Sequence, residues 1–561
     1  MTRLITPLSD PPAIRGIFRT DERARAAYAE GAGIYRIIPA AVALPVDAED
    51  LATILQWARD HRVSVVPRGA GSAMGGGNVG SGVLLDLTTL GAGRLDVEPD
   101  RSVAVTGTAV PYKNLAHAAA RHGLRLPPDP SSGRWATLGG MAATNAAGAR
   151  SVRHGSVRPW VRAIELMTAD GVPGWIRRSN NGAEERQEEP ALPALMRFRK
   201  QVAPSIAVAA ATIRTRFPHT RKNSAGYALD AYLDSGDVID LIIGSEGTLG
   251  IITAIEWQLD RTPAHRAGIG VALAELDTLA DIVLALRQLN ASAIELLDRT
   301  FLDLVASTAE SKDAARRIPA GAAGLLLVEF EHDDPTALRG VVGDAVRAVT
   351  PLAADVETAL TEDEIAQLWA LRHAASPILA RLPEHRRSLQ VIEDGCVPVP
   401  QLGRYVQAVR RAAATHGLEV VLFGHAGDGH LHANLLVDLS RGDWEGAVAT
   451  LLEEVTAQVI RLGGTPAGEH GAGRLRAGLL QQLYGPEIIS LFHAIKHAFD
   501  PNGTLNPGVL LPGRVEPIDQ LKVGSRAVSL PDDIARELRH IEREGEYDRP
   551  RLSLADGNLR L

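Results

Sequence analysis

A glycine-rich loop near the amino terminus most constrains the fold of this chain of 561 residues. Two short apolar segments flank the loop, Val63–Pro67 and Val83–Leu87, and both are predicted to be buried strands. The order is therefore strand, glycine loop, strand, whereas a Rossmann dinucleotide fold requires a helix directly after its glycine loop. The loop is not a Rossmann turn, although it is as rich in glycine.

The same loop has the composition of a phosphate-binding loop. Glycine lets consecutive backbone N–H groups point into one concavity, where they bind phosphate oxygens. The alternative is a flexible surface loop with no ligand. The residues that would form the concavity are Gly69, Gly71, Ser72, Gly75, Gly76 and Gly77.

A second segment of small residues follows a predicted strand, Ser102–Gly107, and a predicted helix, Tyr112–His122. It begins with a rigid PPDP sequence, and small residues dominate from Gly139 to Ala149. Small side chains allow a flat ring or a pyrophosphate group to lie against the backbone. Its polar and glycine positions include Ser131, Ser132, Gly139, Gly140, Thr144, Asn145 and Gly148.

The pattern changes in the middle of the chain. Arg177–Pro190 is charged and is predicted to be a solvated loop or a disordered insert. Asp240–Leu259 predicts a short element, a glycine turn and an alternating strand. After a composition shift at Arg261–Gly268, short strands alternate with amphipathic helices. This second pattern predicts an α+β domain with helices packed on an antiparallel sheet.

Three histidines lie within eight residues of the sequence FGHAGDGHLHAN, Phe423–Asn434. The apolar flanks predict two strands joined by a turn. Side chains alternate along a strand, so His430, His432 and Asn434 are expected on one face of the second strand. His425 precedes the turn and is placed to fold back toward His432. Imidazoles on a rigid strand suit zinc or another borderline divalent ion.

The later sequence GEHGAG supplies the adjacent Glu469 and His470. Gly468 and Gly471 permit a tight turn, so both side chains can reach one cavity. A catalytic metal commonly has three protein ligands and one open position, and Glu469 is the predicted third ligand. The alternative is that the histidines are core or surface residues with local hydrogen bonds.

An arginine lies in a segment with helical periodicity, Asp363–Leu382. Arg372 on such a helix could bind a carboxylate through two hydrogen bonds if it lay near a pocket. A surface arginine is the interpretation that the sequence alone favours.

Charge and composition exclude several classes of protein. The net charge is −8, aromatic residues make up 4%, and no long basic block occurs, so a nucleic-acid partner is not expected. The single cysteine, Cys396, excludes an internal disulfide and a cysteine-ligated iron–sulfur cluster in this chain. No signal-peptide core is present, and no apolar run reaches the roughly 20 residues of a membrane span. We expect a cytoplasmic protein, with a location peripheral to the membrane as the alternative.

The motifs of the first half resemble those of a known flavoprotein fold. PRGAGSAMGGG, PPDPSS…TLGGMAATNAAG…RHG and GSEGTLGIIT occur in the order found in the FAD-binding domain of vanillyl-alcohol-oxidase-type flavoproteins. The resemblance implies that the glycine loop cradles the FAD pyrophosphate. No histidine lies between Pro67 and Gly82 to attach the flavin, so FAD is expected to bind non-covalently. The implied FAD contacts are Arg68, Gly69, Gly71, Ser72, Gly75, Pro130, Ser131, Gly139, Gly140, Thr144, Asn145, Gly148, Gly155, Glu246, Gly250, Ile252 and Asn506.

The second half extends this resemblance. LWALR, EDGCVP, GHAGDGHLHAN, GEHGAG and FDPNGTLNPG follow in the order found in FAD-linked D-2-hydroxy-acid dehydrogenases. That family includes D-lactate dehydrogenase, the glycolate oxidase flavoprotein subunit and D-2-hydroxyglutarate dehydrogenase. The resemblance therefore implies metal-assisted oxidation of a small 2-hydroxy acid to a 2-oxo acid, with hydride transfer to FAD. The implied roles are metal ligands, with zinc expected, for His425, His432 and Glu469; general base for His470; and substrate binding for Arg372 and Asn434.

The sequence departs from the family pattern at two places. His430 stands where many relatives have asparagine, so it could add or replace a metal ligand. Some D-2-hydroxyglutarate enzymes have a lysine shortly before the residue that matches Asp394, where this chain has Ile392 and Glu393. Recognition of a second substrate carboxylate is therefore open.

The expected fold class is α+β, in four parts. They are a two-subdomain FAD-binding domain (1–262), a substrate or cap domain with an antiparallel sheet and the metal site (263–495), a return segment (496–514) and a helical tail (515–561). The tail resembles the connector that leads to an iron–sulfur domain in longer relatives. Its helix over Asp532–Arg551 is expected either to dock a partner or to lie on the surface. The electron acceptor is expected to be an iron–sulfur protein, a quinone or a soluble molecule.

Two other functions remain open at this point. The chain could be a flavoprotein electron-transfer subunit that needs an iron–sulfur partner. The histidines and Glu469 could instead serve a metal-dependent hydrolase, which would leave the flavin-type motifs without a use. The oligomeric state is also open, with a homodimer as one candidate.

Overall fold

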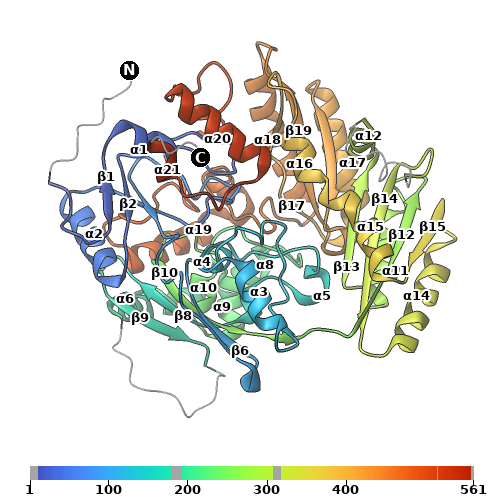
Figure 1. Cartoon of the computed structure of the whole chain (residues 1–561), viewed down its shortest axis with the longest axis horizontal. Coiled ribbons are helices and arrows are strands. Elements are labelled where there is room, and N and C mark those ends of the chain that lie inside the picture. The colour runs from blue at the N-terminus through green and yellow to red at the C-terminus, as the bar shows by residue number, and fades with distance from the viewer. Residues whose placement is uncertain (1–9, 180–191, 308–317, 514–515, 557–561) are drawn as a thin grey trace.

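The computed structural model describes residues 10–179, 192–307, 318–513 and 516–556. Smaller sheets occupy the first half of the chain and one large sheet occupies the second (Figure 1). Residues of both halves line the cavity described below. Most of the charged insert predicted at Arg177–Pro190 lies outside the described residues. In those ranges, no helix has the length and apolar content that crossing a bilayer requires.

The first sheet carries the glycine loop. Its strand order is β1-β2-β4-β3, and the two strands that the loop joins, β3 and β4, are parallel. In the sequence, apolar residues recur at helical spacing after Asp47, which predicts a helix that Asp47 caps. The structure confirms this start, because Asp47 accepts hydrogen bonds from the N–H groups of Glu49 and Asp50 at the first turn of α2. These elements are β1 (Ile17–Arg19), α1 (Glu22–Ala27), β2 (Ala41–Leu44), α2 (Ala48–Asp60), β3 (Val65–Arg68) and β4 (Val83–Asp86).

The second sheet is antiparallel, with the order β5-β6-β10-β8-β9, and a two-stranded pair β11-β7 lies apart from it. Its core includes the fully buried Trp257, whose Nε1–H donates to the Thr106 hydroxyl. The strands are β5 (Leu95–Glu98), β6 (Val103–Gly107), β7 (Leu124–Arg125), β8 (Val161–Met167), β9 (Pro173–Arg177), β10 (Ile251–Gln258) and β11 (Asp260–Arg261). The helices are α3 (Tyr112–Ala120), α4 (Leu138–Thr144), α5 (Ser151–His154), α6 (Pro193–Gln201), α7 (Ala203–Val208), α8 (Ala210–Arg216), α9 (Leu229–Ser235) and α10 (Ile239–Ile242).

The large sheet is antiparallel, as predicted, with the order β15-β12-β14-β13-β18-β19-β16 and β17 paired to β19. Alternation along its strands separates two faces. Ile294 and Leu296 pack with α11, α14, α17 and α18, whereas Ala293 and Leu297 pack with α12, α15 and α16. The strands are β12 (His265–Leu273), β13 (Ala293–Asp298), β14 (Gly324–His332), β15 (Asp355–Ala359), β16 (Arg386–Leu389), β17 (Gly395–Cys396), β18 (Glu419–Gly424) and β19 (His430–Asp438).

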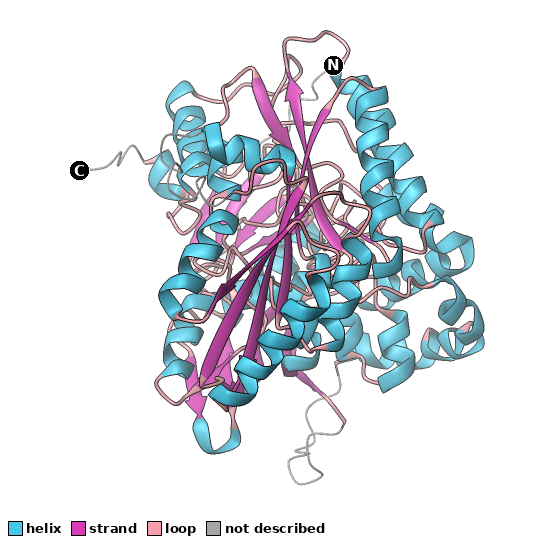
Figure 2. Cartoon of the chain, turned by 90° about the vertical axis from the view of Figure 1, so that its right-hand side faces the viewer, coloured by secondary structure: helices cyan, strands magenta, loops and turns pink. Residues whose placement is uncertain are grey.

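Helices pack around the large sheet (Figure 2). One of them corrects a prediction, because the single helix expected over Asp363–Leu382 is two helices that meet at Ala374. Pro377 has no N–H group, so it is tolerated in the first turn of a new helix but not inside a continuous one. The helices are α11 (Leu279–Gln288), α12 (Arg299–Ser307), α14 (Pro335–Val349), α15 (Glu362–His373), α16 (Ala375–Ala380), α17 (Leu402–Thr415), α18 (Trp444–Arg461) and α19 (Leu480–Phe499).

The carboxyl-terminal tail folds back onto its own chain. The helix predicted over Asp532–Arg551 ends at Gly545, and a further short helix follows. Its apolar side chains are buried against α1 and its polar side is partly exposed, so the helix lies on the surface of its own chain, as one of the two alternatives expected. The predicted alternative, docking on a partner, is not tested by a single chain. The two helices are α20 (Asp532–Glu544) and α21 (Leu552–Ala555).

A buried charge network joins the two halves of the chain. Glu331 on β14 accepts two hydrogen bonds from Arg125, at 2.7 and 3.0 Å, and its side chain is 1% exposed. Arg150 makes the same kind of bidentate pair with Glu329 on β14, through hydrogen bonds of 2.7 and 2.8 Å. Burial opposes ionisation of Glu331, but His154, Arg125 and Arg150 outweigh it and lower the pKa of this carboxyl. The pairs fix how the large sheet sits on the first half.

We predict that Glu331→Gln destabilises the folded protein by about 2–3 kcal/mol at neutral pH, because it leaves partly buried arginines without their carboxylate. In the unchanged protein the folded state lowers the pKa of Glu331 below the ordinary glutamate value of 4.5. The ionised Glu331 therefore stabilises the fold above pH 4.5, and this stabilisation is lost as the pH falls below that value. Thermal melting at several pH values measures both effects. The control is Glu419→Gln, because Glu419 is exposed and pairs with Arg386 at the surface. This change should lower the free energy of unfolding by less than about 1 kcal/mol. Equal losses in the two variants would contradict the role of the network.

Candidate active site

A cavity of about 1090 Å³ lies between the two halves of the chain. Pockets for single small molecules are commonly about 300–1000 Å³, so this cavity is at the large end, as a ligand the size of a dinucleotide requires. Its wall joins the glycine loop to the histidine hairpin. The predicted FAD contacts that line it are Arg68, Gly69, Gly71, Ser72, Pro130, Ser131, Gly139, Gly140, Thr144, Gly148, Glu246, Gly250 and Ile252.

Close packing between segments explains two of the glycines in this wall. A Cβ atom on Gly69 would overlap the Thr137 hydroxyl, and one on Gly139 would overlap the Thr108 hydroxyl. The glycine loop, the β6 end and the α4 start therefore meet without room for side chains. The result is a wall of backbone and small residues, as a flat ring or pyrophosphate requires. One buried donor in this wall, Nη2 of Arg68, has no hydrogen-bond partner among the described residues. These features fit FAD.

Four predicted FAD contacts lie outside the cavity lining formed by the described residues: Gly75, Asn145, Gly155 and Asn506. Asn506 is fully buried, and its Nδ2 donates to the carbonyls of Gly77 and Glu246, both at 2.8 Å. Asn506 therefore holds the glycine loop against the Glu246 segment from a position outside the cavity lining. Asn145 ends α4 in the left-handed conformation, with φ of 53°.

The histidine hairpin forms as predicted. β18 and β19 pair antiparallel with Phe423 opposite His432, and a short 3-10 turn joins them. Gly424 has a φ of 128°, and a Cβ there would lie 2.8 Å from the His432 ring. Glycine at this position lets His425 fold back beside His432, as the sequence predicted.

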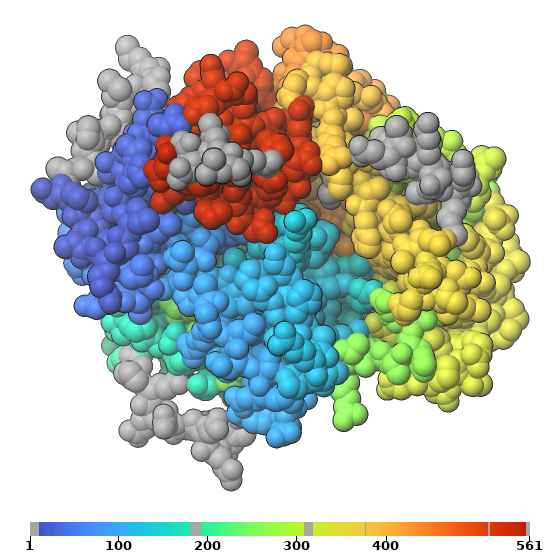
Figure 3. All heavy atoms as spheres, in the orientation of Figure 1, coloured from blue at the N-terminus to red at the C-terminus, as the bar shows by residue number. Residues whose placement is uncertain are grey.

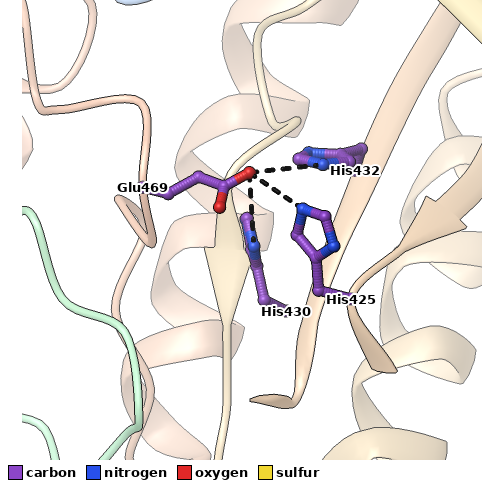
Figure 4. Close-up of side chains that lie close together, drawn as sticks. All are labelled: His425, His430, His432 and Glu469. Carbon is purple, nitrogen blue, oxygen red and sulfur yellow. Dashed lines mark hydrogen bonds and ion pairs between the residues drawn. The ribbon is translucent and has the colours of Figure 1, made fainter. Parts of the chain in front are cut away.

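Glu469 lies at the centre of a buried cluster (Figure 4). Its Oε1 is 3.0 Å from His425 Nε2, 3.6 Å from His432 Nε2 and 4.0 Å from His430 Nδ1. The four potential ligand atoms of these residues lie within 4.8 Å of one another. The sequence prediction that His425, His432 and Glu469 come together is confirmed, and His430 joins them.

The donor set fits a borderline divalent cation. Coordination requires neutral imidazoles and an ionised carboxylate. Burial lowers the pKa of His432 and of His430, and Lys222 lowers the latter further, so both rings favour the neutral form. Burial opposes ionisation of Glu469, but Lys222 and His425 lower its pKa well below the ordinary value. His425 differs, because Glu295 and Glu469 outweigh burial and raise its pKa. A cation would replace that proton between two carboxylates.

Two buried residues that sequence reasoning missed hold this cluster in place. Lys222 Nζ lies 2.7 Å from Glu469 Oε2, and Glu295 Oε1 lies 2.5 Å from His425 Nδ1. A carboxylate behind a ligating histidine fixes the ring orientation and its tautomer. For Glu295 the available signal was a charged residue inside an apolar segment, AIELLD. Lys222 lies between Arg221 and Asn223, where the sequence gives no such signal.

His470 borders the same cluster, with Nε2 3.6 Å from Glu469 Oε1. Its Nδ1 lies 3.2 Å from Glu393, which also pairs with the buried Arg476. Burial lowers the pKa of His470, but Asp394 and Glu393 outweigh it and hold that pKa at about 9. Asp394 also accepts hydrogen bonds from the N–H groups of Glu469 and His470, which fixes the turn that carries both.

Arg372 and Asn434, the predicted substrate residues, both line the cavity. Arg372 is 8% exposed, so the surface-arginine interpretation is wrong. Its Nε donates to Glu295 at 2.6 Å, and its guanidinium lies 5.0 Å from the Phe423 ring centre. One carboxylate, Glu295, therefore contacts both Arg372 and His425. Ser388 on β16 donates to Asn434 at 3.5 Å and adds a hydroxyl to this side of the cavity.

Comparisons with known proteins match both halves of the chain. A model described as the FAD binding domain matches residues 39–173, and one described as the FAD linked oxidases, C-terminal domain, matches residues 262–510. A D-lactate dehydrogenase of Archaeoglobus fulgidus is 29% identical, covering 83% of this chain and 90% of that protein. Glycolate oxidase subunit GlcD of Bacillus subtilis is 29% identical (84% and 89%), and a D-2-hydroxyglutarate dehydrogenase of Xanthomonas citri is 28% identical (84% and 89%).

Solved structures support the fold. A 4-ethylphenol oxidase from Gulosibacter chungangensis superposes with a TM-score of 0.62 at 16% identity, covering 89% of this chain and 95% of that chain. p-Cresol methylhydroxylase superposes with a TM-score of 0.60 at 13% identity, covering 88% and 94%. With the FAD-binding match, these likenesses confirm the predicted vanillyl-alcohol-oxidase-type α+β fold.

We predict that Glu295→Gln weakens divalent-metal binding about 10- to 100-fold, because His425 loses the carboxylate behind its ring. Titration of the apo-protein with Zn²⁺ against a chromophoric chelator measures the affinity. The matched control is Asp298→Asn, a buried carboxylate of the same strand that binds Arg410 on the opposite face of the sheet. Asp298→Asn should retain wild-type affinity. Equal affinity in Glu295→Gln and wild type would show that Glu295 does not support a metal ligand.

Proposed function

We propose, from the premise that this chain belongs to the FAD-linked oxidases, that it oxidises a D-2-hydroxy acid to the 2-oxo acid with FAD as the hydride acceptor. The observation that carries the proposal is the shared cavity, which joins a backbone wall suited to a flavin with the Glu469 cluster and Arg372. The names of the similar proteins give the candidate substrates, D-lactate, glycolate and D-2-hydroxyglutarate.

Arg372 and Asn434 bind and orient the substrate in this proposal. The Arg372 guanidinium binds the carboxylate, and its Nε stays on Glu295, which keeps the arginine fixed relative to His425. The Asn434 amide and the Ser388 hydroxyl supply hydrogen bonds on the same side of the cavity. Orientation of this kind replaces a bimolecular encounter by a positioned reaction.

His470 is the proposed base. It takes the proton of the C2 hydroxyl, and Glu393 and Asp394 stabilise the imidazolium that results. The proposed metal ligands are His425, His432 and Glu469, with His430 in reach of the same ion and zinc as the expected metal. FAD, when bound, supplies the acceptor for the C2 hydride, and the cation, when bound, stabilises negative charge on the hydroxyl oxygen.

The proposal predicts flavin absorbance bands that bleach on anaerobic addition of a D-2-hydroxy acid and that fail to bleach after the metal is removed. Visible spectra with D-lactate, glycolate and D-2-hydroxyglutarate, recorded with and without a chelator, test it. His470→Ala should keep the flavin but reduce it about 100- to 10,000-fold more slowly.

Other outcomes would contradict the proposal in distinct ways. Protein that cannot be loaded with FAD would leave a metal-dependent hydrolase as the better function. A flavin that none of the three acids bleaches would instead favour an electron-transfer subunit or another substrate. A wild-type reduction rate in His470→Ala would remove His470 from the base role.

We also predict a pH dependence that identifies the base. Flavin reduction requires neutral His470, so its rate should rise with pH through the pKa of that group. Glu393→Gln removes a carboxylate that raises this pKa, so the midpoint of the rise should move to lower pH by about one unit. Stopped-flow reduction across pH gives the midpoint. As a control, Glu454→Gln removes the partner of the distant His416 and should leave the midpoint unchanged. An unchanged or higher midpoint in Glu393→Gln would contradict the assignment.

A further inference from the structure

The wall of the cavity includes part of the carboxyl-terminal segment, residues 516–556. The match to the FAD-linked oxidases ends at residue 510, so this segment lies beyond it. Six of its residues line the cavity: Arg539, Glu542, Arg543, Glu544, Gly545 and Tyr547. The segment therefore lines the same cavity as the proposed substrate residues Arg372 and Asn434.

Apolar contacts hold the segment in this position. Ile534, Leu538 and Ile541 of α20 and Leu552 and Leu554 near the chain end share one buried cluster with α1. Backbone pairing adds to this, because Lys522 N–H donates to the Ile34 carbonyl at 2.8 Å. In Figure 3 the segment, in red, lies between the blue amino-terminal part and the yellow residues that precede β16. It is a fixed wall and not a free tail.

A linked set of ion pairs joins this wall to the substrate domain. Glu384 binds Arg387, Arg539 and Arg543, and Glu542 binds Arg387, Arg539 and Lys522. Four cations therefore share two carboxylates, an excess of two positive charges. Burial opposes ionisation of Glu542, but Lys522, Arg387 and Arg539 outweigh it and lower its pKa to about 2. Glu542 is thus negatively charged at neutral pH. The excess of two positive charges was counted with this negative charge included.

Two of these arginines each have a buried N–H donor that is not used in a hydrogen bond within the described residues. Nη2 of Arg539 and Nε of Arg543 are buried and have no hydrogen-bond partner among the described residues. A buried donor without a partner is unfavourable, and a bound anion would satisfy it. Both arginines and Arg387 line the cavity that Arg372 and Asn434 also line. The positive side chains and the proposed substrate residues therefore share one cavity.

We propose that Arg387, Arg539 and Arg543 form a second anion subsite, so that this enzyme selects a 2-hydroxy acid with a second anionic group at its far end. The inference rests on the proposed function, in which Arg372 binds the first carboxylate. A monocarboxylate leaves the excess positive charge and the unpaired donors uncompensated. A dicarboxylate would satisfy them through charge-assisted hydrogen bonds, which are stronger than neutral ones.

The test compares two substrates of equal length, D-2-hydroxyglutarate and D-2-hydroxypentanoate, which differ in the second carboxylate. The full-length, FAD-loaded wild type should prefer the dicarboxylate. Arg539→Gln should lower the ratio of the two kcat/KM values roughly 10- to 100-fold, through the dicarboxylate alone. Arg387→Gln should act in the same direction. Arg549→Gln is the matched control, since it pairs with Glu537 inside the segment and does not line the cavity.

Two results would overturn the subsite. One is equal kcat/KM for both acids in the wild type, and the other is an unchanged ratio in both Arg539→Gln and Arg387→Gln. If neither acid reduces the flavin, the failure belongs to the proposed function. The subsite is then tested by binding of 2-oxoglutarate and 2-oxopentanoate, measured through the change in flavin absorbance. Tighter binding of 2-oxoglutarate that Arg539→Gln abolishes would support the subsite, and equal binding of the two would overturn it.

Discussion

The candidate active site depends on the ion pair between Lys222 and Glu469. Lys222 occupies Oε2 of the carboxylate at 2.7 Å, so Oε1 is the oxygen that faces the imidazoles. Both groups are buried, and loss of either partner would leave an uncompensated charge in the interior. Lys222 belongs to the first half of the chain and Glu469 to the second. The pair therefore orients a proposed metal ligand and also fixes the two halves against each other at the point where they must cooperate.

A second chain of contacts follows from the position of Glu469. His425 bridges Glu469 and Glu295, and Glu295 also binds Arg372. The proposed metal ligand and the proposed substrate arginine thus share one carboxylate on β13, a strand that pairs on both sides within the sheet. A central strand moves little, so neither group can shift without disturbing the other. Burial opposes ionisation of Glu295, but His425 and Arg372 hold its pKa at about 2, which keeps the shared carboxylate charged.

Local patterns in the sequence predicted what short-range physics determines. The Asp47 cap of α2, the hairpin that aligns His430 with His432 and the glycine turn around Glu469 all depend on neighbouring residues. Other features depend on residues that are distant in sequence. Glu295 meets His425 across 130 positions and Lys222 meets Glu469 across 247, and no periodicity encodes such pairs. The tail shows the same limit, because its helical period was readable but the surface that buries it was not.

The arrangement separates the groups proposed for chemistry from those proposed for selectivity. The Glu469 cluster is built on β19, the turn that carries Glu469 and His470, and the Lys222 segment. Arg539 and Arg543, two of the residues proposed for selectivity, lie on α20, which an independent apolar cluster with α1 holds in place. On α20 the buried Ile534, Leu538 and Ile541 recur at helical spacing, and the cavity-facing charges occupy the positions between and beside them. Substitutions at those charged positions can alter the cavity while leaving both the packing of the helix and the buried Lys222–Glu469 pair intact.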